Sequence, residues 1–162
     1  MKNKKMNNKG FSLVELIIVI AIMAVLVGVL APAYLRYVEK SRKSADVQAI
    51  DAVMSAMEAA AIDPSLNLAD GDKMTVTLSA SGLVSTATLN VEDENKKNNI
   101  EDELETTLGQ YKLKGSWVDT TNSIVIEGTV DEGNVTFECD QKDAIAEYSA
   151  DLAAQFTTTT TP

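Results

Sequence analysis

The apolar residues of this chain are concentrated in one stretch near its start. From Phe11 to Leu35 the sequence is almost continuously hydrophobic, and no residue from Leu16 to Ala33 is charged. At a rise of about 1.5 Å per residue, a helix of this stretch is long enough to cross the roughly 30 Å hydrocarbon core of a bilayer. Residues 11–35 are therefore predicted to form a membrane-spanning helix.

The helical pattern continues past this stretch. Residues 36–62 contain no glycine or proline, and Pro64 then ends the helix, because the residue before a proline is disfavoured in helical geometry. Apolar side chains at spacings of three and four form one stripe: Val47, Ile50, Met54, Met57 and Ala61. Charged side chains, Asp46 among them, are interpreted as lying largely off this stripe. We expect one helix from Phe11 to Ile62, whose first half projects from a head and whose second half packs on it.

Residues 63–156 have the mixed pattern of a small α+β head. Alternating apolar and polar residues predict strands at 74–79, 111–117, 124–130 and 135–139, and a short one at 86–91. The turn chemistry of Asp131-Glu132-Gly133-Asn134 predicts that the last two strands form a hairpin. Apolar residues at helical spacing predict helices at 99–108 and 142–156. Antiparallel strands crossed by one long helix indicate an α+β fold, with residues 157–162 as a flexible threonine-rich tail.

The residue types that most catalytic and metal sites need are scarce. The chain has no His and one Cys, Cys139, which excludes Ser-His and Cys-His dyads, an internal disulfide and a multi-cysteine metal cluster. Two acidic runs, 92–94 and 101–105, lack the spaced ligands and the glycine of a calcium loop and are interpreted as a solvated face. Cys139 alternates with Phe137 and Val135, which favours a buried thiol over a reactive one. We therefore expect no enzyme activity, no cofactor and no metal.

The charge distribution separates the first ten residues from the rest. The net charge is −10, and residues 1–10 contain four lysines and no acidic residue, so the remainder carries −14. Such an acidic surface repels a phosphate backbone, and no nucleic-acid partner is expected. A basic start before an apolar run is also typical of a cleaved signal peptide, but the proline in Ala31-Pro32-Ala33 makes a poor cleavage site. The length of the run and the continuing helix favour an anchor that stays with the protein.

A specific motif marks the junction of the basic leader and the apolar run. This motif combines a glycine, an aromatic residue and a glutamate five residues after the glycine, in the segment Lys9-Gly10-Phe11-Ser12-Leu13-Val14-Glu15-Leu16. A carboxylate inside such a run costs roughly 2.5–3.5 kcal/mol on insertion scales, so random sequence rarely contains one. Further along, Pro32 lacks an N–H and leaves the carbonyl of Gly28 without its helical partner, which weakens the helix there. This pattern resembles the type III signal of type IV pilins and pseudopilins.

The resemblance implies roles in processing and assembly. A prepilin peptidase would cut between Gly10 and Phe11, and the same enzyme class would methylate the new amino group of Phe11. Glu15 would pair with the Phe11 amine of a neighbouring subunit, and the helix would bend or melt locally around Gly28 and Pro32 in the filament. The expected partners are other pilin subunits, the peptidase, the pilus assembly machinery and, before assembly, the membrane.

The expected organisation follows from the motif and the pattern together. It comprises a cleaved leader 1–10, a membrane and filament-core half-helix 11–35, an amphipathic half-helix 36–62, a head 63–156 and a tail 157–162. The expected function is that of a structural subunit of a surface pilus used in adhesion, motility or aggregation. The prepilin would be a single-pass membrane protein and the assembled subunit extracellular. Two alternatives stay open: a pseudopilin of a type II secretion-like or competence system, and a membrane-anchored secreted protein.

Overall fold

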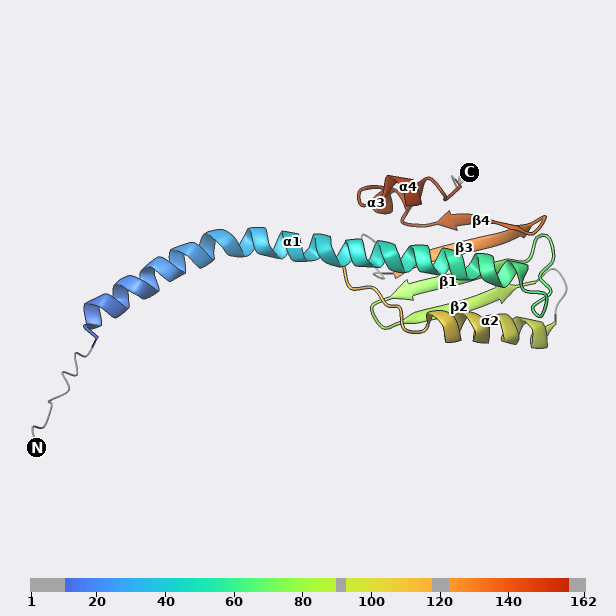
Figure 1. Ribbon diagram of the computed structural model, residues 1–162, viewed down its shortest axis with the longest axis horizontal. Helices are drawn as coiled ribbons and strands as arrows, with labels where there is room; N and C mark the ends of the chain where they lie inside the picture. Colours follow the sequence, from blue (N-terminus) through green and yellow to red (C-terminus); the bar gives the residue numbers. More distant parts are fainter. Residues whose placement is uncertain (1–10, 90–92, 118–122, 158–162) are drawn as a thin grey trace, which may run out of the picture. The chain divides into compact units, whose positions relative to one another are not determined.

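The computed structural model describes residues 11–89, 93–117 and 123–157. Its elements in chain order are α1 (Leu13–Ile62), β1 (Lys73–Ser79), β2 (Leu83–Thr88), α2 (Glu94–Leu108), β3 (Ser123–Asp131), β4 (Asn134–Cys139), α3 (Lys142–Ala146) and α4 (Ala150–Ala153), as labelled in Figure 1. The chain forms two compact units, one ending at Val38 and the other beginning at Glu39. The expected α+β architecture, a long first helix followed by a small antiparallel sheet, is confirmed.

The part of α1 that precedes Glu39 exposes its apolar side chains. Leu13 is 72% exposed and Leu35 is 66% exposed, and the large hydrophobic residues between them are similar. By length and composition α1 is able to cross a membrane. Gly28 and Pro32 both lie inside the helix. This unit therefore offers an apolar surface to its surroundings.

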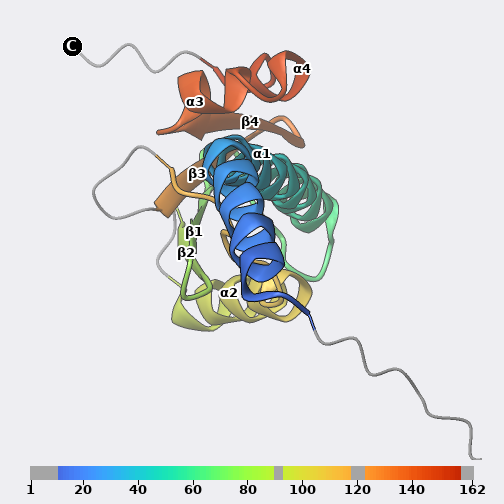
Figure 2. The same cartoon turned by 90° about the vertical axis from the view of Figure 1, so that its left-hand side faces the viewer.

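The head is built on a four-stranded antiparallel sheet with the strand order β2-β1-β3-β4. Alternate residues of β1 and β3, such as Val76 and Ile126, are fully buried on one face, and their neighbours form a more polar face. The second half of α1 covers the buried face with fully buried Ile50, Val53 and Met57. In Figures 1 and 2, this half-helix lies between α2 and the α3–α4 pair. The core of the head is thus a helix-on-sheet layer.

The hairpin and the helix expected before it are confirmed with shifted bounds. β3 and β4 are joined by Glu132 and Gly133, both at positive φ (48° and 80°), as a two-residue type I′ turn requires. α2 begins earlier than residue 99 because Asp93 caps it, its carboxylate accepting two backbone N–H groups of the first turn. The short strand expected at 86–91 is β2, which starts at Leu83 and ends at Thr88.

Two predicted elements are wrong. Residues 111–117 alternate like a strand but form none, because Lys114 and Gly115 donate their backbone N–H groups to the Asp46 carboxylate rather than to a neighbouring strand. The helix expected at 142–156 is divided into α3 and α4. Ser149 has extended geometry (φ −152°), and its hydroxyl accepts the N–H of Leu152 as a new N-cap, which ends one helix and begins the next.

Candidate functional site

The N-terminal end of α1 is held by a capping arrangement. Leu16 donates its N–H to the Ser12 carbonyl at 3.2 Å, and Ser12 donates its own N–H to Glu15 Oε2 at 2.9 Å. This is one half of a capping box, in which a glutamate three residues into the helix satisfies the N–H of the N-cap residue. The neighbouring side chains of Leu13, Val14 and Leu16 are all more than half exposed. Glu15 therefore places a carboxylate among exposed apolar side chains while it stabilises the first turn.

The other expected site residues divide into two groups. Phe11 is 93% exposed, lies two residues before the start of α1 and is four residues from Glu15. Gly10 lies outside the described residues. Gly28 and Pro32 lie several turns further along α1, and a Cβ added to Gly28 would meet no atom within 4 Å. The structure thus groups Phe11 with Glu15 at the helix start and leaves Gly28 and Pro32 as a separate feature.

A buried carboxylate in the head was missed by the sequence interpretation. Asp46, expected off the apolar stripe, is only 1% exposed. It accepts hydrogen bonds from the N–H groups of Lys114 and Gly115, both at 2.8 Å, and from Trp117 Nε1 at 2.9 Å. Three donors satisfy the carboxylate and attach this loop to α1. The signal that could have revealed Asp46 is its spacing, because it lies one helical turn before the buried Ile50.

The same loop is also held by Lys43. Its ammonium group lies 5.3 Å from the centroid of the Trp117 ring and 5.5 Å from that of Tyr148. The two rings meet edge to face with centroids 6.1 Å apart. We call Lys43, Asp46, Gly115, Trp117 and Tyr148 the Asp46 latch. It joins α1, the loop after α2 and the C-terminal segment.

Gly115 is expected to tolerate no side chain. A Cβ there would lie 2.7 Å from Lys43 Cγ and 3.1 Å from Asp46 Oδ2. Gly115→Val should therefore lower the free energy of unfolding by about 1–3 kcal/mol through overpacking. Urea unfolding measures this loss, with Lys112→Val in the exposed part of the same loop as the control. Equal midpoints for the two variants would show that the loop is not pressed against α1.

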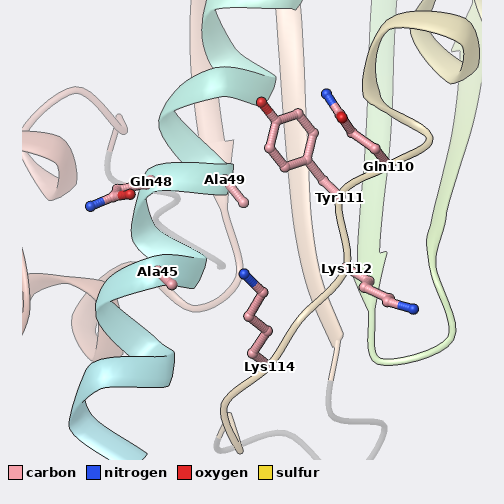
Figure 3. Close-up of a pocket in the computed structure, with 7 residues that line it drawn as sticks. All are labelled: Ala45, Gln48, Ala49, Gln110, Tyr111, Lys112 and Lys114. Atoms are coloured by element: carbon pink, nitrogen blue, oxygen red, sulfur yellow. The ribbon is translucent and has the colours of Figure 1, made fainter.

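Beside the latch, α1 and the loop enclose a pocket of about 300 Å³. It is lined by Ala45, Gln48, Ala49, Gln110, Tyr111, Lys112 and Lys114. Figure 3 shows the side chains of Tyr111 and Lys114 directed towards α1, whereas those of Gln48 and Lys112 point away. The Lys114 ammonium group and the Tyr111 phenol, beside Ala45 and Ala49, are suited to bind an acidic group.

Within the described residues, neither the acidic runs nor Cys139 forms a reactive or metal-binding centre. No group of three His, Cys, Asp or Glu side chains in that part of the chain is arranged to hold a metal ion. Asp93 instead caps α2, and Glu101 accepts the N–H of Ala87 at 3.0 Å. Cys139 is partly buried, and burial raises the pKa of its thiol to about 12. At neutral pH it is therefore a thiol and not a nucleophilic thiolate.

Comparison with known protein families finds a match at the start of the chain. A family model described as the prokaryotic N-terminal methylation motif matches residues 5–31, which include the Gly10–Phe11 junction, Glu15 and Gly28. No curated protein and no solved structure matches the chain. The motif is the signal of type IV prepilins and pseudopilins, and it indicates a structural protein, anchored in the membrane as a prepilin, rather than an enzyme. With this signal, a long apolar first helix and a small antiparallel α+β head, the chain resembles the type IV pilins and pseudopilins.

Proposed function

We propose that the chain is the structural subunit of a type IV pilus, a surface filament used in adhesion, motility or aggregation. The observation that carries this proposal is the position of Glu15, a charge at the start of an exposed apolar helix and four residues after Phe11. A carboxylate surrounded by hydrocarbon is costly unless a cation compensates it. Cleavage before Phe11 frees such a cation, and a neighbouring subunit places it opposite Glu15. Assembly therefore removes the free-energy cost of the uncompensated Glu15 carboxylate in the membrane.

The proposal gives each part of the chain a task. Residues 1–10 are the leader, which a prepilin peptidase removes between Gly10 and Phe11. Residues 11–35 anchor the prepilin and then pack in the filament core. Residues 36–62 and the head 63–156 form the outer body, and 157–162 is its tail. The prepilin is a membrane protein, the assembled subunit is extracellular, and its partners are further copies, the peptidase and the assembly machinery.

Gly28 and Pro32 are proposed as the place where α1 yields during packing. Proline has no N–H to donate, so the carbonyl of Gly28 lacks its helical partner. Glycine weakens the helix by about 1 kcal/mol relative to alanine. No neighbouring side chain crowds Gly28, since a Cβ there would meet no atom within 4 Å. A bend or local melting at this point lets the apolar half-helix adjust to its neighbours in the filament.

A pseudopilin of a type II secretion-like or competence system carries the same signal and is the second candidate. Its rod is short and stays within the envelope, whereas a pilus extends from the surface. Shearing whole cells and imaging the released material tests the difference. Long filaments that react with an antibody to this chain support the pilus, whereas subunits found only in the envelope fraction indicate the pseudopilin. A membrane-anchored secreted protein would give no polymer in either fraction.

Processing of the N-terminus is expected to produce a chain that begins at Phe11 and carries one N-methyl group. Intact mass spectrometry of the protein from cells measures both features. Gly10→Leu should leave the leader attached, because a side chain would obstruct close approach of the peptidase to this backbone. Lys9→Ala, beside it, is the control and should still be processed. A mature start at Met1, or a cut near Ala33, would contradict the prepilin assignment.

A further inference from the structure

The acidic character of the subunit creates a problem for a homopolymer. Without residues 1–10 each copy carries −14, so neighbouring copies repel one another, and favourable head-to-head contacts need positive groups. Several cationic side chains are already engaged within the head: Lys43 with two rings, Lys73 with Glu127, Lys96 with Asp72, and Lys142 with the Phe156 carbonyl. Lys112 and Lys114 are exposed and form no ion pair with any residue in the described ranges. These two lysines are thus available to a partner.

The loop that carries Lys114 is held beside α1, so that this lysine lines the pocket. The Asp46 carboxylate holds the backbone of Lys114 and Gly115 at 2.8 Å, so the loop that carries the lysine is fixed on the helix. Figure 3 shows the Lys114 side chain reaching towards Ala49, with Tyr111 on the same side. The short side chains of Ala45 and Ala49 leave space in the pocket, whose volume is roughly 300 Å³. Because the backbone of this loop is already held, little further loop ordering is needed when an anion enters the pocket.

The negative charges that complement Lys114 lie in the β3–β4 turn, at the opposite end of the sheet from the pocket. The loop that carries Lys114 contacts the last residue of β1, since Leu113 donates its N–H to the Ser79 carbonyl at 3.0 Å. The β3–β4 turn lies beside the first residues of β1, where the Val130 N–H is donated to the Asp72 carbonyl at 2.9 Å. Figure 1 shows this turn at the end of the head where β1 begins.

The turn itself is a protruding acidic tip. Asp131 and Glu132 are both exposed, and the Glu132 N–H is donated to Asp70 Oδ1 at 2.9 Å, which ties the tip to the preceding loop. Gly133 lets the chain reverse in two residues, so the tip is narrow. The negative charge of this narrow hairpin complements the lysines that line the pocket.

We propose that the pocket between α1 and the 110–114 loop binds the acidic β3–β4 turn of a second copy of this chain. The inference rests on the proposed function, because it concerns contacts between subunits of the polymer. The two surfaces lie at opposite ends of one head, so head-to-tail stacking makes the contact heterologous and leaves one surface of each copy for the next subunit. Repetition of such a contact propagates along a filament. It also brings positive groups to the place where two acidic heads meet.

Charge reversal tests the pairing in cells that make the full-length chain. Lys114→Glu alone, and Glu132→Lys alone, should each reduce the yield of sheared filaments roughly tenfold, because an attraction becomes a repulsion. The two changes combined should restore the yield to within about twofold. Lys97→Glu on α2 makes the same change of charge elsewhere and is the control. Filaments that are unaffected by either reversal, or a combined variant no better than the single ones, would overturn the inference.

Cross-linking tests the geometry without changing these charges. Gln110→Cys lies in the pocket and Asn134→Cys at the turn, and a short bis-maleimide should join them between neighbouring subunits into a ladder of oligomers. The native Cys139 adds little background, because the pKa of its thiol is raised to about 12 by burial. Gln110→Cys with Ser81→Cys, in the β1–β2 turn near the pocket, should give no ladder. Absence of filaments from wild-type cells would contradict the proposed function, whereas intact filaments without the Gln110–Asn134 ladder would contradict this contact alone.

Discussion

Replacing Glu15 with Leu is expected to abolish filaments while membrane insertion stays intact or improves. Insertion should not suffer, because a carboxylate in the apolar span costs roughly 2.5–3.5 kcal/mol that leucine avoids. Filaments should be lost, because the amine freed at Phe11 then finds no opposite charge in the neighbouring subunit. The measurements are the amount of subunit in the membrane fraction and the amount of sheared filament, both by immunoblot, with electron microscopy of the cell surface.

The structure provides the control that separates charge from capping. Glu15 also accepts the Ser12 N–H at 2.9 Å, so Glu15→Leu removes a helix cap as well as a charge. Glu15→Gln keeps an acceptor oxygen for that N–H and removes only the charge. We expect Glu15→Gln to lose filaments as Glu15→Leu does. If Glu15→Gln cells made normal filaments and Glu15→Leu cells did not, the carboxylate would act through the helix start and the charge-pairing account would fail.

Replacing Asp46 with Ala is expected to cost the head about 3–4 kcal/mol, because three donors, those of Gly115 and Trp117 in buried hydrogen bonds, lose their acceptor at once. This is a large share of the roughly 5–15 kcal/mol that stabilises a typical domain. Two of the donors are backbone groups of Lys114 and Gly115, so the loop should also detach from α1. Urea unfolding followed by the fluorescence of Trp117, the one tryptophan of the chain and itself a donor to Asp46, measures the loss.

Asp51→Ala provides the matched control for Asp46→Ala. Asp51 lies on the same helix and is exposed, so its removal should change the free energy of unfolding by no more than about 0.5 kcal/mol. Because both variants place alanine in the same helix, helix propensity cannot explain a difference between them. Equal midpoints for the two variants would show that the hydrogen bonds to Asp46 do not hold the loop.

The sequence by itself determined the features that depend on neighbouring residues. The apolar run, its glutamate at position 15 and the glycine before Phe11 are local patterns, and a family model of the same region matches residues 5–31. The spacing of Ile50, Met54 and Met57 likewise placed the buried side of α1 correctly. The turn was predictable because Gly133, at φ 80°, is of the residue type that positive φ favours.

Only the tertiary structure decided where polar groups find their partners. Residues 111–117 alternate as a strand would, yet the backbone N–H groups of Lys114 and Gly115 are donated to Asp46, a residue far away in the sequence. Asp46 was interpreted as lying off the apolar stripe, and the backbone donors that make its burial favourable lie 68 and 69 residues further along the chain. Periodicity records which side of an element is apolar. It does not record which distant backbone group satisfies a buried charge, and this pairing is what assembles the latch and positions Lys114.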